Sequence, residues 1–220
     1  MFAGHVGAGL ALASVERRVN AGAFVGAALL LDLVLWPLVL LGWETVSVPQ
    51  DFAASHQLHF VFPYSHGLFA ALAWSALAAA LAWLGLRRLT SAARSRAALA
   101  VAAAVFSHWL LDALVHRPQL PLAGAGSPAV GLGLWDRMEL ALWIEAAIAV
   151  GGLGWFVAGS GWARRRAVAL VALGLLVLAF TVVGMTLAPP PPSAQALALS
   201  SWLTLIVVTA LVWWAGRAGR

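Results

Sequence analysis

Residues 22–43 read GAFVGAALLLDLVLWPLVLLGW, and the only ionisable side chain among them is Asp32. As a helix this stretch would be about 33 Å long, close to the roughly 30 Å hydrocarbon core of a bilayer. A carboxylate at the middle of such a helix costs about 2.5–3.5 kcal/mol on insertion scales. It therefore usually faces a bundle interior or a wet cavity, so the stretch predicts a membrane span and a functional site together.

The composition extends this interpretation to the whole chain of 220 residues. It is 63% hydrophobic and only 10% charged, whereas soluble domains carry about 25% charged residues. The absence of cysteine excludes disulfides and thiolate metal sites. The basic residues are scattered in short loops, so the sequence pI near 11.5 requires no nucleic-acid partner. A basic segment followed by a small-residue cleavage site is missing at the N-terminus, and we expect no cleaved signal peptide.

The predicted fold class is all-α, a polytopic transmembrane helix bundle with six full spans and a short N-terminal helix. The spans are expected at 22–43, 65–86, 97–116, 138–158, 167–187 and 197–215, and the short apolar helix at 2–15. Residues 2–15 fit a half-span, an interfacial helix or a tilted seventh helix. Residues 1–220 form one membrane domain, in which the helices of 1–158 carry the ionisable residues and those of 159–220 support them.

The distribution of arginines predicts the orientation, because cytoplasmic loops are enriched in basic residues. One set of alternate loops, with the C-terminal tail, holds Arg17, Arg18, Arg87, Arg88, Arg94, Arg96, Arg164, Arg165, Arg166, Arg217 and Arg220, and the other set holds Arg117 and Arg137. The C-terminus is therefore expected in the cytoplasm, and loops 44–64 and 117–137 outside.

In this orientation the ionisable residues gather in one leaflet. His66 begins a span, His108 and Asp112 lie in the outer half of the next one, and Glu145 is about two turns into the span that follows. His5 also lies toward the outside if its helix inserts. Asp32 is the exception, about 16 Å below Trp43 at 1.5 Å per residue, and a tilted helix or an inward cavity would be needed to join it to the others.

His108 and Asp112 are four residues apart, so they share a helix face and can reach one ion. His116 is one turn further, displaced by about 80°, and can join from the rim. The alternative is an Asp–His hydrogen bond that only satisfies two buried groups. Imidazole and carboxylate are ligands suited to zinc.

The other polar residues have two possible roles each. Tyr64 and Ser65 would donate hydrogen bonds to a ligand or cap a helix. Arg117 would bind an anionic group such as phosphate, or neutralise a nearby aspartate. Glu145 would serve in the site or pair with an arginine. The remaining acids, Glu44, Asp51, Asp136 and Glu139, are expected to be solvated, and His56 and His59 to lie at the surface.

Four features in order resemble bacterial membrane-bound, metal-dependent hydrolase-like proteins, a family also described as LexA-binding, inner-membrane-associated hydrolases. They are His5 near the N-terminus, Asp32 in the next helix, Ser-His at 65–66 opening a third helix, and SHWLLD at 107–112 in a fourth. The resemblance implies the bacterial inner membrane and a metal-ligand set of His5, Asp32, His66, His108 and Asp112. A narrower group, described variously as hypothetical protein, permease or metal-dependent hydrolase, is similar over nearly the whole length. The broad family usually has a second aspartate where Val34 stands here, so one ion is expected.

These patterns favour a hydrolase with one divalent ion, zinc, and with Glu145 or His116 as general base. Because the site would open to the outer leaflet, a lipid or lipid-linked phosphoester is the expected substrate class. The alternatives are a transporter that uses its intramembrane carboxylates and histidines, and a structural protein locked by a metal or an Asp–His network.

Overall fold

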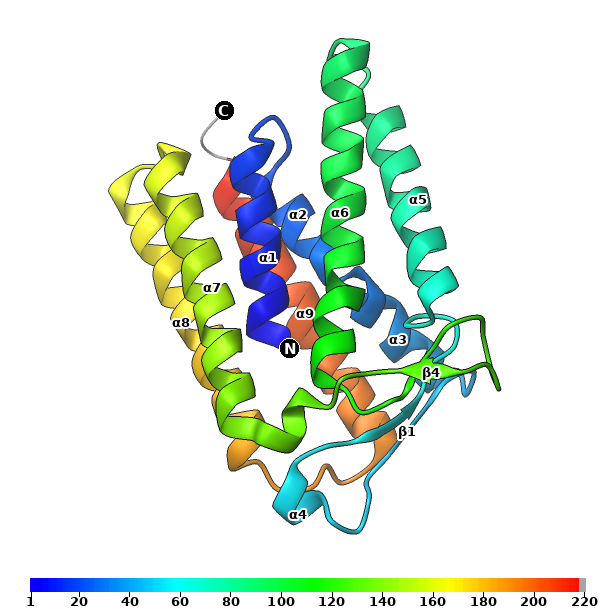
Figure 1. Ribbon diagram of the computed structural model, residues 1–220. Helices are drawn as coiled ribbons and strands as arrows, with labels where there is room; N and C mark the ends of the chain where they lie inside the picture. The colour runs from blue at the N-terminus through cyan, green and yellow to red at the C-terminus, as the bar shows by residue number, and fades with distance from the viewer. Residues whose placement is uncertain (218–220) are drawn as a thin grey trace.

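The computed structural model describes residues 1–217, which form a bundle of roughly parallel and antiparallel helices (Figure 1). The long helices are α5 (Leu68–Gly85), α6 (Ser91–Val115), α7 (Met138–Ser160), α8 (Arg164–Thr186) and α9 (Ala194–Arg217). The shorter ones are α1 (Phe2–Val15), α2 (Ala21–Ala28), α3 (Leu30–Leu40) and the single turn α4 (Phe52–Ser55), with a 3-10 helix, η1 (Leu134–Arg137).

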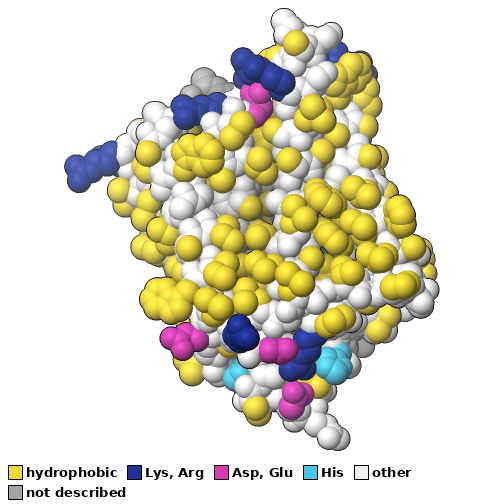
Figure 2. Space-filling view, viewed as in Figure 1, with side chains coloured by type: hydrophobic (Ala, Val, Ile, Leu, Met, Phe, Trp, Pro, Cys, Tyr) yellow, Lys and Arg dark blue, Asp and Glu magenta, His cyan; other side chains and the backbone are white. Residues whose placement is uncertain are grey.

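Five helices are long and apolar enough to cross a membrane, and α2 and α3 together qualify as a sixth, bent span. Figure 2 shows an apolar band across the middle of the face in view, with basic and acidic side chains at one end and with basic, acidic and histidine side chains at the other. Lipid solvates such a band, so large side chains such as Leu81, Leu176 and Phe180 remain exposed outside the protein core. The predicted class is confirmed: this is a multi-pass, α-helical membrane protein.

The N-terminal helix α1 is a core helix of this bundle. It packs along α7 and also contacts α2, α6 and α8, and Figure 1 shows it surrounded by other helices. Most of its residues are buried, including Leu10 and His5 at 1% exposure each. A short helix that is apolar on every face is stable when all its faces are covered. His5 is therefore held firmly inside the protein.

The span expected at 22–43 is not one continuous helix. It breaks at Leu29, whose φ of −100° and ψ of 4° leave the helical region, and the axes of α2 and α3 differ by 52°. The break lies eight residues before Pro37, too far for the proline ring to clash at that turn. The bend changes the direction of α3 and brings Asp32, in its first turn, toward the ends of α5 and α6.

A cap of short strands and turns covers the end of the bundle where α6 ends and α7 begins. Strands β1 (Thr45–Ser47) and β2 (His59–Val61) pair antiparallel, and so do β3 (Leu120–Pro121) and β4 (Ala129–Val130). Asp136 accepts hydrogen bonds from Gln57 and Arg117, and the side chain of Gln119 accepts one from the amide of Phe60. These bonds join the two long loops into one layer.

The close packing of α1 against α7 can be tested by substituting two adjacent glycines of α7. A Cβ atom on Gly152 would lie 2.0 Å from the carbonyl oxygen of Gly7, whereas one on Gly151 would meet nothing within 4 Å. We expect Gly152→Ala to destabilise the protein by about 1–3 kcal/mol or more, because backbone atoms would have to separate. Gly151→Ala is the matched control and should be neutral or stabilising by up to about 1 kcal/mol.

The measurement is the thermal unfolding midpoint of each variant in detergent micelles. Equal midpoints for the two variants would show that α1 does not pack closely against α7.

Candidate metal centre

Five side chains from four parts of the chain, four of them buried and Asp32 half-buried, meet near the capped end of the bundle. They are His5 of α1, Asp32 of α3, His66 of the turn before α5, and His108 and Asp112 of α6. The side chain of Asp32 is 23% exposed, and those of the other four are at most 4% exposed. These are the five residues that the sequence motifs singled out, and the bend at Leu29 brings Asp32 within reach of the rest.

Three atoms of this cluster form a nearly equilateral triangle. The Nε2 atoms of His66 and His108 are 3.2 Å apart, and Oδ2 of Asp112 lies 3.3 Å from the first and 3.2 Å from the second. Tetrahedral coordination with bonds of about 2.0–2.1 Å separates neighbouring ligand atoms by about 3.3–3.4 Å. The triangle thus has the size of one face of a coordination tetrahedron. Oδ1 of Asp32 lies 3.5 Å and 3.8 Å from the two nitrogens, on the more open side.

The break between α2 and α3 determines the tautomer of His108. Nδ1 of His108 lies 2.7 Å from the carbonyl oxygen of Ala28, the last residue of α2. A carbonyl oxygen only accepts, so Nδ1 carries the proton and donates it. Nε2 of the neutral ring then presents a lone pair to the cluster. Carbonyl groups at a helix end need partners from outside the helix, and His108 supplies one.

A carboxylate that is remote from the cluster determines the tautomer of His66 in the same way. Glu44 accepts hydrogen bonds from the backbone amides of Tyr64 and Ser65 and, at 2.7 Å, from the Ser65 hydroxyl. The Ser65 oxygen lies 2.7 Å from Nδ1 of His66. Because the hydroxyl proton is donated to Glu44, Nδ1 must donate to the hydroxyl oxygen, and a neutral His66 ring then carries its lone pair on Nε2. Trp109 adds a hydrogen bond to the His66 carbonyl.

The result is a cluster of hydrogen-bond acceptors facing one another. When both rings are neutral, the two Nε2 lone pairs converge with the oxygens of Asp112 and Asp32. The buried N-terminal amino group of Met1 lies 3.8 Å from Oδ1 of Asp112 and is one positive charge beside these two carboxylates. Outer hydrogen bonds of this type fix the orientation of metal-binding histidines in proteins. The arrangement can therefore hold a metal ion, which would supply further positive charge.

His5 occupies a different position from the triangle. Its Nε2 lies 3.1 Å from Oδ1 of Asp112, the carboxylate oxygen that faces away from His66 and His108. Its ring stacks on that of His108, with centroids 3.7 Å apart. His5 also forms a second possible ligand group with Asp32 and His108. It either orients Asp112 or binds metal itself.

A cavity of about 130 Å³ opens from the cluster toward the cap. It is lined by Met1, Asp32, Leu35, Trp36, Phe60, Phe62, His66, Asp112, His116 and Trp135. Nε2 of His116 lies 3.9 Å from Oδ2 of Asp112, and Nδ1 is buried without a hydrogen-bond partner among residues 1–217. Burial lowers the pKa of His116, one residue beyond the end of α6, to about 4, so its ring is neutral at pH 7.

The other predicted site residues lie further from the cluster. Glu145 is buried but accepts a hydrogen bond from the amide of Gly4, which holds the N-terminal turn of α1. Arg117 is bonded to Asp136 in the cap, as its alternative role predicted. The side chain of Tyr64 is 55% exposed and does not line the cavity, so the structure does not bring it to the cluster. Ser65 contacts His66, the ligand candidate, through its hydroxyl group.

Glu44 is the functional residue that the sequence analysis missed. We expected a solvated charge at the end of a span, but Glu44 is 1% exposed and makes three hydrogen bonds. Its nearest sequence signal is its place directly after the span expected at 22–43, which does not distinguish an acid folded inward from one in solvent. The Ala28 carbonyl was also missed, because backbone groups carry no residue-type signal.

Comparisons of the chain with protein-family models, with curated proteins and with solved structures gave no match. The family resemblance of the sequence motifs therefore remains a prediction, and the function is argued from the site itself.

Hydrogen bonds connect Glu44 to Ser65 and Ser65 to His66, so we expect changes at Glu44 and Ser65 to alter the metal affinity, although neither residue is a candidate ligand. We expect Glu44→Gln and Ser65→Ala each to weaken Zn²⁺ binding by about 10–100-fold, since His66 would lose the partner that fixes its ring. Glu139→Gln is the control, because that acid is exposed at the same end of the bundle. Affinity is measured by competition with a chromophoric chelator in detergent. Unchanged affinity in both variants would contradict the orienting role of Glu44.

Proposed function

We propose that the chain is a membrane-embedded, metal-dependent hydrolase with one divalent ion, zinc, bound by His66, His108 and Asp112. The observation that carries this proposal is the triangle of acceptor atoms with edges of 3.2–3.3 Å. Neutral imidazole and carboxylate are common zinc ligands, and catalytic zinc sites use three protein ligands and leave a position open.

The open position would face the cavity, where Asp32 and His116 are found. A zinc ion bound there would polarise an ester or phosphoester and lower the pKa of a water molecule. Asp32, the most exposed of the five acids and histidines of the cluster, would accept a hydrogen bond from that water. His116 has an unpartnered nitrogen in a neutral ring, so it can accept or return a proton. The expected alternative base, Glu145, is already bonded to Gly4 and does not line this cavity.

The proposed substrate class is a lipid or lipid-linked phosphoester reached from the outer leaflet of a bacterial inner membrane. Two features support it: the cavity leads to the end of the bundle with fewer arginines, and its walls include Trp36, Phe60, Phe62 and Trp135. Aromatic walls exclude water from the reacting groups and suit a substrate with apolar chains. The basic-residue rule assigns that end to the outside.

A transporter is the second candidate, because Asp32 begins the second half of a broken span. Transporters bind ions and substrates where membrane helices are interrupted. Against this function, buried apolar residues of α1, α2 and α6 separate the cluster from the arginine-rich end within residues 1–217. Among them are Leu10, Phe24, Val25 and Ala104, each at most 1% exposed. An ion would need a second state of the bundle to leave in that direction.

Metal content is the first test of the proposal. We expect the purified protein to contain about one zinc ion per chain, and His108→Ala and Asp112→Ala to remove it, because each deletes a corner of the triangle. His59→Ala is the matched control, since that histidine is exposed in the cap. Elemental analysis by mass spectrometry gives the ratio of metal to protein. Metal-free protein of normal stability would exclude the hydrolase.

Turnover is the second test, made with the zinc-loaded protein and a panel of phospholipids and lipid-linked phosphates in micelles. We expect release of a phosphorylated headgroup that stops on chelation and resumes with Zn²⁺. His116→Gln should lower kcat by about 10²–10⁴-fold, as for the loss of a general base, while metal content is unchanged. Bound metal without any turnover would favour a structural role, and proton- or substrate-driven flux in liposomes would favour the transporter.

A further inference from the structure

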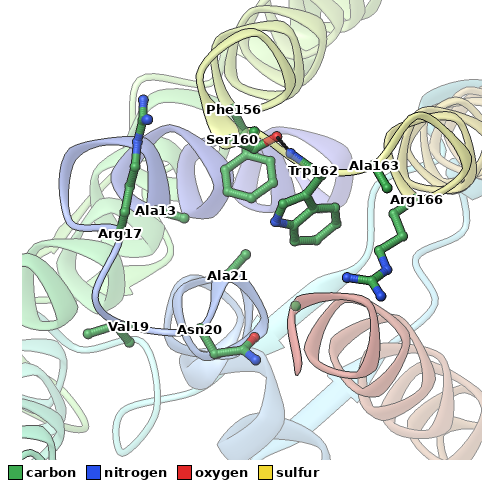
Figure 3. Close-up of a pocket in the computed structure, with 12 residues that line it drawn as sticks. Ala13, Arg17, Val19, Asn20, Ala21, Phe156, Ser160, Trp162, Ala163 and Arg166 are labelled. Atoms are coloured by element: carbon green, nitrogen blue, oxygen red, sulfur yellow. Dashed lines mark hydrogen bonds between the residues drawn. The ribbon is translucent and has the colours of Figure 1, made fainter. Parts of the chain in front are cut away.

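A larger cavity, of about 380 Å³, lies at the opposite, arginine-rich end of the bundle (Figure 3). Five helix ends surround it: the ends of α1, α7 and α9 and the beginnings of α2 and α8. The residues that the argument uses are Arg17, Asn20, Phe156, Ser160, Trp162 and Arg166. The proposed hydrolase does not use this cavity, which is separated from the metal centre by the apolar layer described above.

The charge at this cavity is positive and uncompensated within residues 1–217. Neither Arg17 nor Arg166 forms an ion pair there, and the acid next to Arg17, Glu16, is already paired with Arg18 at 3.1 Å. Arg17 uses its Nε to donate to the Ser14 carbonyl, and Figure 3 shows its guanidinium pointing away from Asn20 and Trp162, so Arg17 contributes positive charge at the edge of the cavity. Figure 3 shows Arg166 extending from α8 toward α9 beside the cavity.

Helix α8 adds a second unfavourable positive charge. Its first three residues are Arg164, Arg165 and Arg166, and no side chain caps this end. The N-terminus of a helix carries a partial positive charge, so anions stabilise it and cations do not. A bound anion would offset both the partial positive charge of the α8 N-terminus and the charges of the arginines. Asn20 caps α2, the other helix that begins at this cavity, so α8 is the one that begins there without a side-chain cap.

The walls of the cavity are held by contacts that do not depend on a ligand. The side chain of Asn20 bonds to the amide of Gly22 and to the carbonyl of Trp213, which joins α2 to α9. The rings of Phe156 and Trp162 pack edge to face with centroids 5.1 Å apart. The Ser160 hydroxyl accepts a hydrogen bond from the backbone amide of Trp162. Figure 3 shows this aromatic pair beside Ser160. The cavity is a preformed space with apolar and cationic walls.

We propose that this cavity binds a phosphoester anion, either the headgroup of an anionic phospholipid or a soluble phosphate ester. Guanidinium groups bind phosphate through charge-assisted hydrogen bonds. Basic pockets between the ends of membrane helices bind the headgroups of anionic lipids. The position at the edge of the apolar band, with a tryptophan in the wall, is also typical of the membrane interface. The two sources share one chemistry and differ in whether acyl chains are attached.

The test measures binding of dioleoylphosphatidylglycerol to the full chain in mixed micelles, from its effect on the thermal unfolding midpoint. Dioleoylphosphatidylcholine at the same mole fraction is the lipid control, and glycerol 3-phosphate is the soluble probe. We expect phosphatidylglycerol to raise the midpoint. Its dissociation constant should rise about fivefold in Arg166→Gln and about 30-fold in R17Q/R166Q, if each arginine contributes as basic residues do at anionic membranes.

The double variant R88Q/R96Q is the matched control. It removes the same charge from the same end of the bundle, but both arginines are exposed and neither lines the cavity. Arg166→Gln keeps the test valid if the loss of Arg17 impairs folding, because Arg166 forms no ion pair within residues 1–217.

The outcomes separate the two sources. A midpoint shift with phosphatidylglycerol that only the cavity variants lose supports a lipid site. An equal shift with glycerol 3-phosphate supports a site for a soluble phosphate ester. The proposal is overturned if neither probe shifts the midpoint, or if R88Q/R96Q weakens binding as much as R17Q/R166Q does, since general surface charge would then explain it.

Discussion

Two imidazole rings in the core of this protein turn their Nε2 atoms toward each other at 3.2 Å. They do so because Nδ1 of each ring donates to a fixed oxygen, the Ala28 carbonyl in one case and the Ser65 hydroxyl in the other. Two carboxylates complete the cluster, and in apolar surroundings two negative charges beside the single amino group of Met1 are costly. A cation held between the two rings and Asp112 would offset that cost.

The break in the second membrane span connects this cluster to the fold. A straight helix over residues 22–43 would place Asp32 too far from the capped end and would bury the carbonyl of Ala28 in its own hydrogen bonds. The bend at Leu29 has two effects. It changes the direction of α3, which carries Asp32, and it ends α2 at Ala28, whose carbonyl oxygen accepts the hydrogen bond from His108. A broken helix is tolerated in a membrane where protein covers it, and here α6 and α9 do so.

The two ends of the bundle have different chemistry. The capped end holds the acceptor cluster and a small cavity with aromatic walls, whereas the opposite end holds a larger cavity with cationic walls. Tightly packed apolar side chains lie between them, and the short helix α1 runs through this layer with His5 at one end and Ser14 near the other. The proposed hydrolysis at one end and the proposed anion binding at the other are compatible, because neither cavity depends on the other for its walls.

The membrane class, the approximate spans and the five ionisable residues of the cluster were predictable from the sequence, since apolar runs and isolated charges within them are local patterns. The sequence did not reveal the break at Leu29, the burial of α1 or the inward position of Glu44. Those depend on which surfaces meet: a carboxylate at a helix end looks the same in sequence whether water or the Ser65 hydroxyl satisfies it. Only the tertiary structure decided the protonated nitrogen of each histidine, because that choice is made by backbone and side-chain oxygens from distant parts of the chain.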